Sequence, residues 1–295
     1  MEYFYLWTIF LVMEYFMEFS IKDSLLESYL NTYPLDTESI DLSRFGLEDI
    51  PKSLQSFKNL RHLTLSYNYI TYIPEFIFEL ENLHTLDLNN NKIEKLPNNI
   101  NRMSNLEYLL LSNNLLQTFP DSISDLTNLR YLAVAYNQIQ QLPNNIGNLQ
   151  NLIKLLINNN SIEYLPNSFV YLTNLENLNL SYNKLKKIPD EFGNLSKLLQ
   201  LRLDNNYIEY LPKSVQNLHK LKYLYLNNNK FLGFPNTLIE IILKNRTHVN
   251  LSNNYIVKLP EKVISTKYSV YQLSKICVHN NLLSLNENIS PIIYF

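Results

Sequence analysis

The chain has 295 residues, with 25 Lys or Arg against 27 Asp or Glu, and a net charge of −2. This balance argues against a protein that binds nucleic acid or an anionic membrane, either of which favours a basic excess. The single cysteine, Cys277, excludes an internal disulfide framework and a multi-cysteine zinc site. With four glycines and no glycine-rich phosphate motif, a nucleotide loop is excluded as well. We expect a reduced, cytoplasmic compartment.

Residues 3–13 are nearly all apolar, which suits the apolar segment of a signal peptide and is too short to span a bilayer. Glu2 stands where a signal peptide carries Lys or Arg, and no small-residue cleavage site follows. Three interpretations of residues 1–19 stay open: an unusual signal or membrane anchor, an ordered part of an N-terminal cap, or a poorly ordered or even untranslated leader. For the last, Met-Glu-Tyr-Phe recurs at Met13, so Met13 or Met17 could be the true start.

A helix is predicted over residues 14–30, where apolar residues at helical spacing include Ile21, Leu25, Leu26, Tyr29 and Leu30. The helix ends before Pro34. We therefore assign residues 1–36 to an N-terminal apolar segment and a helical cap that covers the open apolar end of the domain that follows.

Residues 37–295 are built on one repeat. Eight segments reading L-x-x-L-x-L-x-x-N-x-Φ-x-x-Φ-P, where Φ is apolar, follow one another at a spacing of 23 residues. They open at Leu60, Leu83, Leu106, Leu129, Leu152, Leu175, Leu198 and Leu221. A fixed period of this length predicts a solenoid, in which each unit buries its apolar side against its neighbours.

Less regular units lie at both ends. One opens at Thr37 and has Phe45 at the Asn place, and two longer ones open at Arg246 and Leu273, so that eleven units are expected. Residues 238–243 are predicted to form a true helical turn. The chain ends in four apolar residues, 292–295, which either fold back as a C-terminal cap or form an edge for self-association.

The L-x-L segment alternates with period two, which predicts a short strand with its leucines facing the core. Stacked units give a parallel sheet on the concave side of an α/β solenoid, a horseshoe whose outer segments are short 3-10, irregular or helical. The Asn after each strand is expected to hydrogen-bond backbone groups of its own turn and of the next one. The proline of each unit is expected at the first position of an outer helical turn.

These segments resemble the leucine-rich repeat family, and the 23-residue form with L-P-x-x-Φ-x-x-L-x-N is similar to its intracellular, Ras-related class, which is also common in bacterial repeat proteins. The resemblance covers residues 37–295. It implies a horseshoe fold and a protein-binding role, and it names no partner because members of the family bind very different proteins.

Function is expected in the strand residues that point away from the core. The N-terminal units place Asp41 and Asp87 there, whereas the middle and C-terminal units place apolar, aromatic and cationic residues there. Exposed aromatic residues and Arg are frequent anchors of protein interfaces. We predict a protein-binding surface made of Tyr108, Leu110, Tyr131, Ala133, Tyr136, Leu156, Arg202, Tyr223 and Tyr225.

No catalytic residue, metal ligand or cofactor is expected. Strand alternation places Cys277 and His279 on one face, yet without a cleft or an oxyanion device they are read as ordinary surface residues. The leading hypothesis is a monomeric, non-enzymatic, cytoplasmic scaffold that binds a protein and acts in intracellular signalling. The alternative is a secreted or surface-anchored recognition protein delivered by its N-terminal apolar segment.

Overall fold

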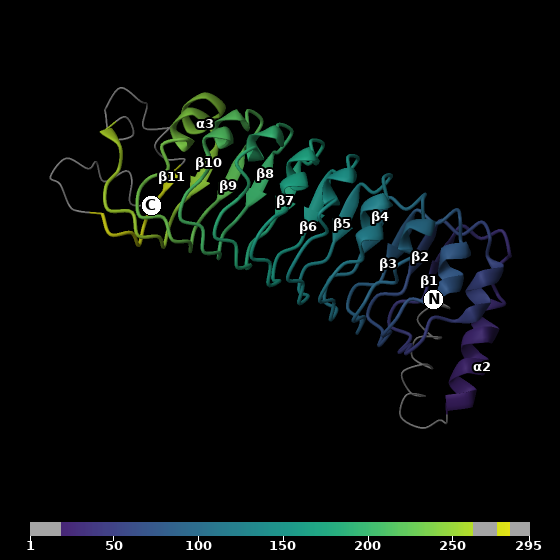
Figure 1. Ribbon diagram of the computed structural model, residues 1–295. Helices are drawn as coiled ribbons and strands as arrows, with labels where there is room; N and C mark the ends of the chain where they lie inside the picture. Colours follow the sequence, from purple (N-terminus) through teal and green to yellow (C-terminus); the bar gives the residue numbers. More distant parts are fainter. Residues whose placement is uncertain (1–18, 262–275, 284–295) are drawn as a thin grey trace.

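The computed structural model describes residues 19–261 and 276–283, which form an elongated, open solenoid with β1 and β11 at its opposite ends (Figure 1). Eleven short parallel strands form one sheet in chain order. They are β1 (Ser39–Asp41), β2 (His62–Thr64), β3 (Thr85–Asp87), β4 (Tyr108–Leu110), β5 (Tyr131–Ala133), β6 (Lys154–Leu156), β7 (Asn177–Asn179), β8 (Gln200–Arg202), β9 (Tyr223–Tyr225), β10 (His248–Asn250) and β11 (Ile276–Cys277). The predicted solenoid of eleven units is confirmed.

In each of the units that begin with β1 to β9, the outer side of the solenoid carries one short helix. Eight are 3-10 helices: η1 (Lys52–Ser56), η2 (Glu75–Glu79), η3 (Ile100–Arg102), η4 (Asp121–Asp125), η5 (Ile146–Asn148), η6 (Asn167–Tyr171), η7 (Phe192–Asn194) and η8 (Lys213–Asn217). The helical turn predicted at residues 238–243 is present as α3 (Leu238–Asn245).

The core lies between the sheet and the outer helices and runs without interruption through the described units. The central residue of each strand is buried, as at Leu63 in β2 and Leu155 in β6. At least one apolar residue of each outer helix closes the layer from the other side. The rings of Phe169 and Phe192 stack there with centroids 6.2 Å apart. The invariant apolar letters of the repeat are thus explained by burial.

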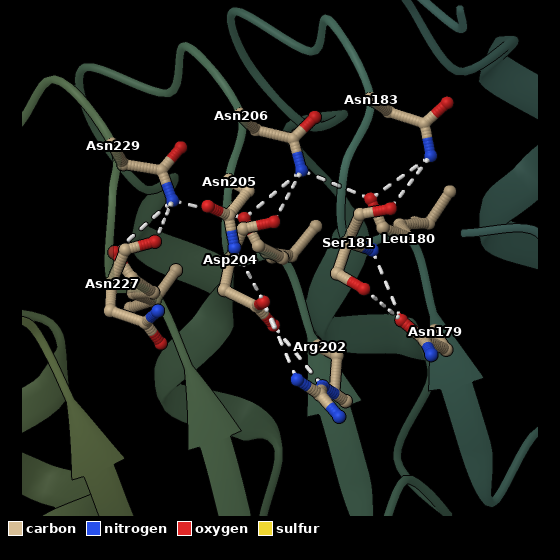
Figure 2. Close-up of polar contacts among 12 residues, drawn as sticks. Asn179, Leu180, Ser181, Asn183, Arg202, Asp204, Asn205, Asn206, Asn227 and Asn229 are labelled. Carbon is tan, nitrogen blue, oxygen red and sulfur yellow. Dashed lines mark hydrogen bonds and ion pairs between the residues drawn. The ribbon is translucent and has the colours of Figure 1, made fainter. Parts of the chain in front are cut away.

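The asparagines form the expected ladder, but each one hydrogen-bonds to the preceding unit and not to the next one. Asn206 donates from Nδ2 to the carbonyl of Leu203 in its own turn (3.1 Å) and to that of Leu180 in the preceding unit (3.0 Å), as Figure 2 shows. Its Oδ1 accepts the N–H of Leu185, also in the preceding unit (3.0 Å). The prediction that the second partner lies in the next turn was wrong, because the amide points back toward the N-terminal neighbour.

The prolines lie one step or more before the outer helix and not at its first position. Pro51 is the residue before η1, with φ −60° and ψ 129°, so its backbone is extended. Before η3, Asn99 intervenes and Pro97 lies further upstream. The proline precedes the helix because its carbonyl accepts a hydrogen bond from the residue three positions later. Leu54 N–H donates to Pro51 O at 3.2 Å, and Ile100 N–H donates to Pro97 O at 3.2 Å.

At the N-terminal end, the described part of the predicted helix is α2 (Phe19–Leu30). Leu26 and Leu30 are buried in the core, and the ring of Tyr29 lies 5.2 Å from that of Phe45. The division at residue 36 and the role of α2 as a cap stay predictions. The other predictions for residues 1–18 and for the apolar C-terminal tail lie outside the described residues.

In the described part of the chain, no helix has both the length and the apolarity that a membrane span requires.

Candidate protein-binding surface

All the predicted surface residues except Tyr136, which lies in the turn after β5, flank the buried leucines of the strands, on the face of the sheet that turns away from the core. The unit spacing aligns equivalent residues across the sheet: Tyr108 pairs with Tyr131 between β4 and β5, and Tyr131 pairs with Lys154 between β5 and β6. Each place in the repeat therefore becomes a straight row of side chains, and the chemistry of the surface can be read along these rows.

The middle of this face carries a central patch, which consists of Tyr108, Leu110, Tyr131, Ala133, Tyr136 and Leu156. The rings of Tyr108 and Tyr131 meet edge to face with their centroids 6.4 Å apart, an arrangement that aromatic pairs favour. Tyr108 remains 39% exposed. Leu110, Ala133 and Leu156 follow one another along the adjacent row.

One residue of the central patch differs from the prediction. Ala133 was expected to face solvent, but it is only 4% exposed. Its side chain is a single methyl group, whereas its neighbours along the row are Leu110 and Leu156, which are larger. The patch is therefore slightly recessed at Ala133, which contributes little contact area of its own.

The sequence interpretation missed Lys154. Its Nζ lies 4.5 Å from the centroid of the Tyr131 ring, which is a cation–π contact. Lys154 stands in the same row as Tyr108 and Tyr131, so the spacing of 23 residues could have found it. The aromatic pair is thus bordered by a positive charge on its C-terminal side.

Toward the C-terminal end, the structure brings the other predicted residues together in two pairs. The guanidinium of Arg202 lies 4.9 Å from the ring centroid of Tyr225, its neighbour in the row. The ring of Tyr223 stacks on that of His248, with centroids 5.4 Å apart and planes 17° apart. His248 was not predicted as part of the surface, and its place in the row after Tyr223 was the available signal. We call Arg202, Tyr223, Tyr225 and His248 the C-terminal group.

Arg202 has a second partner that Figure 2 shows. Its Nε lies 3.1 Å from Oδ1 of Asp204, and Nδ2 of Asn205 donates to the other carboxylate oxygen at 2.9 Å. Asp204 is 2% exposed. A carboxylate removed from water to this degree requires a charged partner, so Arg202 stabilises the fold as well as shaping the surface.

The N-terminal end of the face is acidic, as predicted. Asp41 and Asp87 lie in one row, two units apart, with Thr64 between them. Burial raises the pKa of Asp87, the N–H of Asn89 that donates to its carboxylate opposes this, and the nearby charge of Asp41 raises the pKa further. The surface thus runs from an acidic end, through the central patch, to the C-terminal group.

The residue just before the ladder asparagine adopts a left-handed backbone in all of the described units that carry such an asparagine. Asn occupies this position in most units, which fits its tolerance of positive φ. Three units instead carry Tyr67 (φ 57°), Tyr136 (φ 55°) and Tyr182 (φ 53°), all of them exposed. A bulky residue in this conformation raises the backbone free energy of the folded state. The fold does not require tyrosine at this position, because most units have Asn there.

At the C-terminal end of the sheet, the structure describes one contact between Cys277 and His279. Cys277 Sγ lies 2.9 Å from Nδ1 of His279, so the two side chains do share a face as predicted. Among the residues that the structure describes, no three His, Cys, Asp or Glu side chains gather as a metal-binding group.

Family models match most of the repeat array. The model described as a leucine-rich repeat region matches residues 40–129 and 117–184, and the model described as leucine rich repeat matches residues 173–231. The fold and the rows of its sheet define a solenoid of the leucine-rich repeat class. The chain belongs to the leucine-rich repeat family. A search of the curated proteins found no match.

Solved structures of the same class superpose well. A leucine-rich repeat protein of Leptospira interrogans, LIC12759, is 28% identical with a TM-score of 0.77, and the match covers 90% of this chain and 72% of that one. The leucine-rich repeat ectodomain of the receptor kinase GASSHO1/SCHENGEN3 from Arabidopsis thaliana, in complex with CASPARIAN STRIP INTEGRITY FACTOR 2, is 26% identical (TM-score 0.73; 88% of this chain, 32% of that one). The plant peptide hormone receptor RGFR1, in complex with RGF2, is 30% identical (TM-score 0.71; 84% and 41%). The chain thus spans less than half the length of either receptor structure.

Proposed function

We propose that this chain is a monomeric, non-enzymatic scaffold that binds a protein or peptide partner through the solvent-facing side of its sheet. The observation that carries the proposal is the central patch, in which Tyr108, Tyr131, Leu110 and Leu156 lie on a surface where folding requires none of them. Aromatic residues next to a cation are typical of the energetically dominant part of an interface.

The similar structures support a binding role. Both plant receptors described above are in complex with a ligand, and RGFR1 is a peptide hormone receptor. These are properties of those proteins, and at about a quarter to a third identity they support the kind of activity and not a particular partner.

The mechanism we propose is preorganisation. Apart from Tyr136, which lies in the turn after β5, each presented side chain stands beside a buried leucine in a hydrogen-bonded strand. Tyr108, Tyr131 and Lys154 also hold one another in place. Little conformational entropy then remains to be lost on association, so the contact free energy of the aromatic residues is available for affinity. The acidic end and the C-terminal group would orient the partner along the stack.

The experiment begins with an affinity pull-down on the full chain to obtain the partner, followed by dissociation constants for variants. Tyr108→Ala with Tyr131→Ala should weaken binding by about tenfold or more, because two anchor rings are lost. Tyr171→Ala is the matched control, since Tyr171 is exposed at the end of η6 on the outer side of the solenoid. Equal affinity of the double variant and the control would contradict the proposal.

For localisation, we propose the cytoplasm and a role in intracellular signalling, on the basis of the single Cys277 and the absence of a Cys-clamped cap from the sequence. Membership of the 23-residue intracellular class would agree with this. N-terminal sequencing of the mature protein from cells tests the proposal. Loss of about the first 20 residues, as expected of a cleaved secretory signal, would instead favour the secreted or surface-anchored alternative.

A further inference from the structure

The loops that follow β8, β9 and β10 form a shallow pocket at the edge of the sheet, outside the surface proposed for protein binding. Its volume is about 320 Å³, at the lower end of the range for small-molecule sites. The exposed part of its lining consists of Asn205, Asn228, Asn253, Tyr207, Tyr255 and Lys230, and the ladder asparagines lie behind them.

Three of these residues form a regular row of amides. Asn205, Asn228 and Asn253 occupy the left-handed position of three consecutive units, with φ of 57°, 57° and 54°. Their backbones are thus one strand apart, a step of about 4.8 Å. Each amide offers both a donor and an acceptor.

Part of this hydrogen-bonding capacity is unused within the protein. Asn205 uses its Nδ2 on Asp204 (2.9 Å), and Asn253 uses its Oδ1 to accept from Asn280 (2.8 Å). Within the described part of the chain, the amide of Asn228, between them, makes no side-chain hydrogen bond. The row therefore presents an acceptor from Asn205, a donor and an acceptor from Asn228, and a donor from Asn253 to whatever lies in the pocket.

Two aromatic rings flank the row of amides. Tyr207 and Tyr255 hold the same place in their units, two units apart, and both are exposed. Lys230 holds that place in the unit between them, and its Nζ donates to Tyr255 Oη at 3.0 Å. The phenol of Tyr255, and more weakly that of Tyr207, raises the pKa of Lys230, which agrees with its position between the two rings.

This composition selects among ligand classes. The described residues that line the pocket include no aliphatic side chain and no carboxylate, so an apolar anchor residue of a protein would gain little there. A polyanion would meet a single cation whose Nζ is already hydrogen-bonded. Hydroxyl groups, by contrast, are both donors and acceptors and match the amides, and the C–H faces of a sugar ring match the faces of tyrosine rings.

We propose that this edge pocket binds a neutral carbohydrate, a short chain of pyranose units lying along the stack against Tyr207 and Tyr255 with its hydroxyl groups on the row of amides. The period of an extended pyranose chain is close to the spacing between parallel strands, so successive sugars would meet successive asparagines. The pocket is separate from the central patch. The carbohydrate proposal can therefore fail or succeed independently of the protein-binding proposal.

The test is calorimetric titration of the full chain with short oligosaccharides of glucose, of N-acetylglucosamine and of galacturonic acid. We expect saturable binding of at least one of the two neutral probes, weakened about tenfold or more by Tyr207→Ala and by Tyr255→Ala. Asn228→Gly, which retains a residue suited to positive φ and removes the amide, should also weaken binding several-fold without loss of the folded state.

Tyr69→Ala is the matched control. Tyr69 holds the same place in the repeat as Tyr207, is equally exposed at 47%, and has Lys92 over its ring at 4.8 Å, but its pocket is lined by Glu48 and Asp49 and lacks the row of amides. The affinity of the Tyr69→Ala variant for the neutral oligosaccharides should equal that of the unmodified chain. No saturable binding of either neutral probe, or equal losses in Tyr207→Ala and Tyr69→Ala, would overturn the proposal. Binding of the galacturonic acid probe alone, abolished by Lys230→Met, would overturn it as well and mark an anion site.

Discussion

Arg202 and Asp204 form an ion pair across the boundary between the surface and the interior of the sheet. Nε of Arg202 lies 3.1 Å from Oδ1 of Asp204, and the side chain of Arg202 is 39% exposed whereas that of Asp204 is 3% exposed. Most other units carry Ser or Asn at the place of Asp204, as at Ser181 and Asn227. The guanidinium of Arg202, which was predicted as an anchor for a binding partner, therefore also neutralises a buried carboxylate within the fold.

Removing this guanidinium should destabilise the protein. We expect Arg202→Ala to lower the free energy of unfolding by about 1–3 kcal/mol, because among the described residues Asp204 would keep only Asn205 as a side-chain partner. Adding Asp204→Ser, the residue at the equivalent place in the preceding unit, should restore most of the loss. Urea denaturation of the two variants measures this, and a single variant as stable as the unmodified chain would contradict the assignment.

The close contact between neighbouring outer helices predicts that two glycines cannot be replaced without loss of stability. A Cβ on Gly147 would meet the carbonyl oxygen of Ser168, and a Cβ on Gly193 would meet that of Ser214. Because both obstacles are backbone atoms, Gly147→Ala and Gly193→Ala should each lower the free energy of unfolding by about 1–3 kcal/mol.

Gly233→Ala supplies the control for this pair, since no heavy atom beyond its two chain neighbours lies within 4 Å of the position where its Cβ would stand. We expect it to leave the midpoint of thermal unfolding unchanged or slightly raised. If all three alanine variants unfolded at the same temperature, the close packing of the outer helices would not limit these positions.

The left-handed tyrosines predict opposite effects on stability and binding. Tyr136 has a φ of 55° and is 56% exposed, so Tyr136→Asn should raise the free energy of unfolding by about 1 kcal/mol as the backbone strain is relieved. If Tyr136 belongs to the binding surface, the same change should weaken the partner's affinity. Tyr182→Asn is the control, with the same gain in stability and no change in affinity, because Tyr182 lies outside the central patch. An affinity unaffected by Tyr136→Asn would remove Tyr136 from that patch.

The acidic end of the surface predicts a dependence of stability on pH. The pKa of Asp87 is raised in the folded state, chiefly by burial, so the folded protein holds this proton more tightly than the unfolded chain. Stability then falls as the pH rises through the interval between the unfolded and folded pKa values. Asp87→Asn should therefore be more stable than the unmodified chain at pH 7, and the difference should shrink below about pH 4.

Denaturation curves at several pH values test this, with Asp41→Asn for comparison. Asp41 contributes the smallest of the effects on the pKa of Asp87, so its removal should give a smaller gain at pH 7. A difference between Asp87→Asn and the unmodified chain that stayed constant with pH would show that burial of the charge is not its origin.

How much could be predicted from the sequence varies from residue to residue. The strands and their order follow from leucines that recur at one spacing, so Leu63 and Leu155 were placed in the core correctly. Rows across the sheet follow from the same spacing, and Tyr108 does lie beside Tyr131. The same spacing places Lys154 beside Tyr131 and His248 beside Tyr223, but the residue types alone do not show that these side chains contact the rings.

By itself, the sequence determined which side of each unit is buried and how the units stack, because burial of one leucine layer imposes a single register on a periodic chain. Only the tertiary structure decided what each surface residue is free to do. Ala133 is covered although its strand position is outward, Arg202 is paired with a buried carboxylate, and Tyr136 holds a left-handed backbone. These properties depend on the side chains and backbone of neighbouring turns, and a repeat pattern specifies the places of those neighbours but not their contacts.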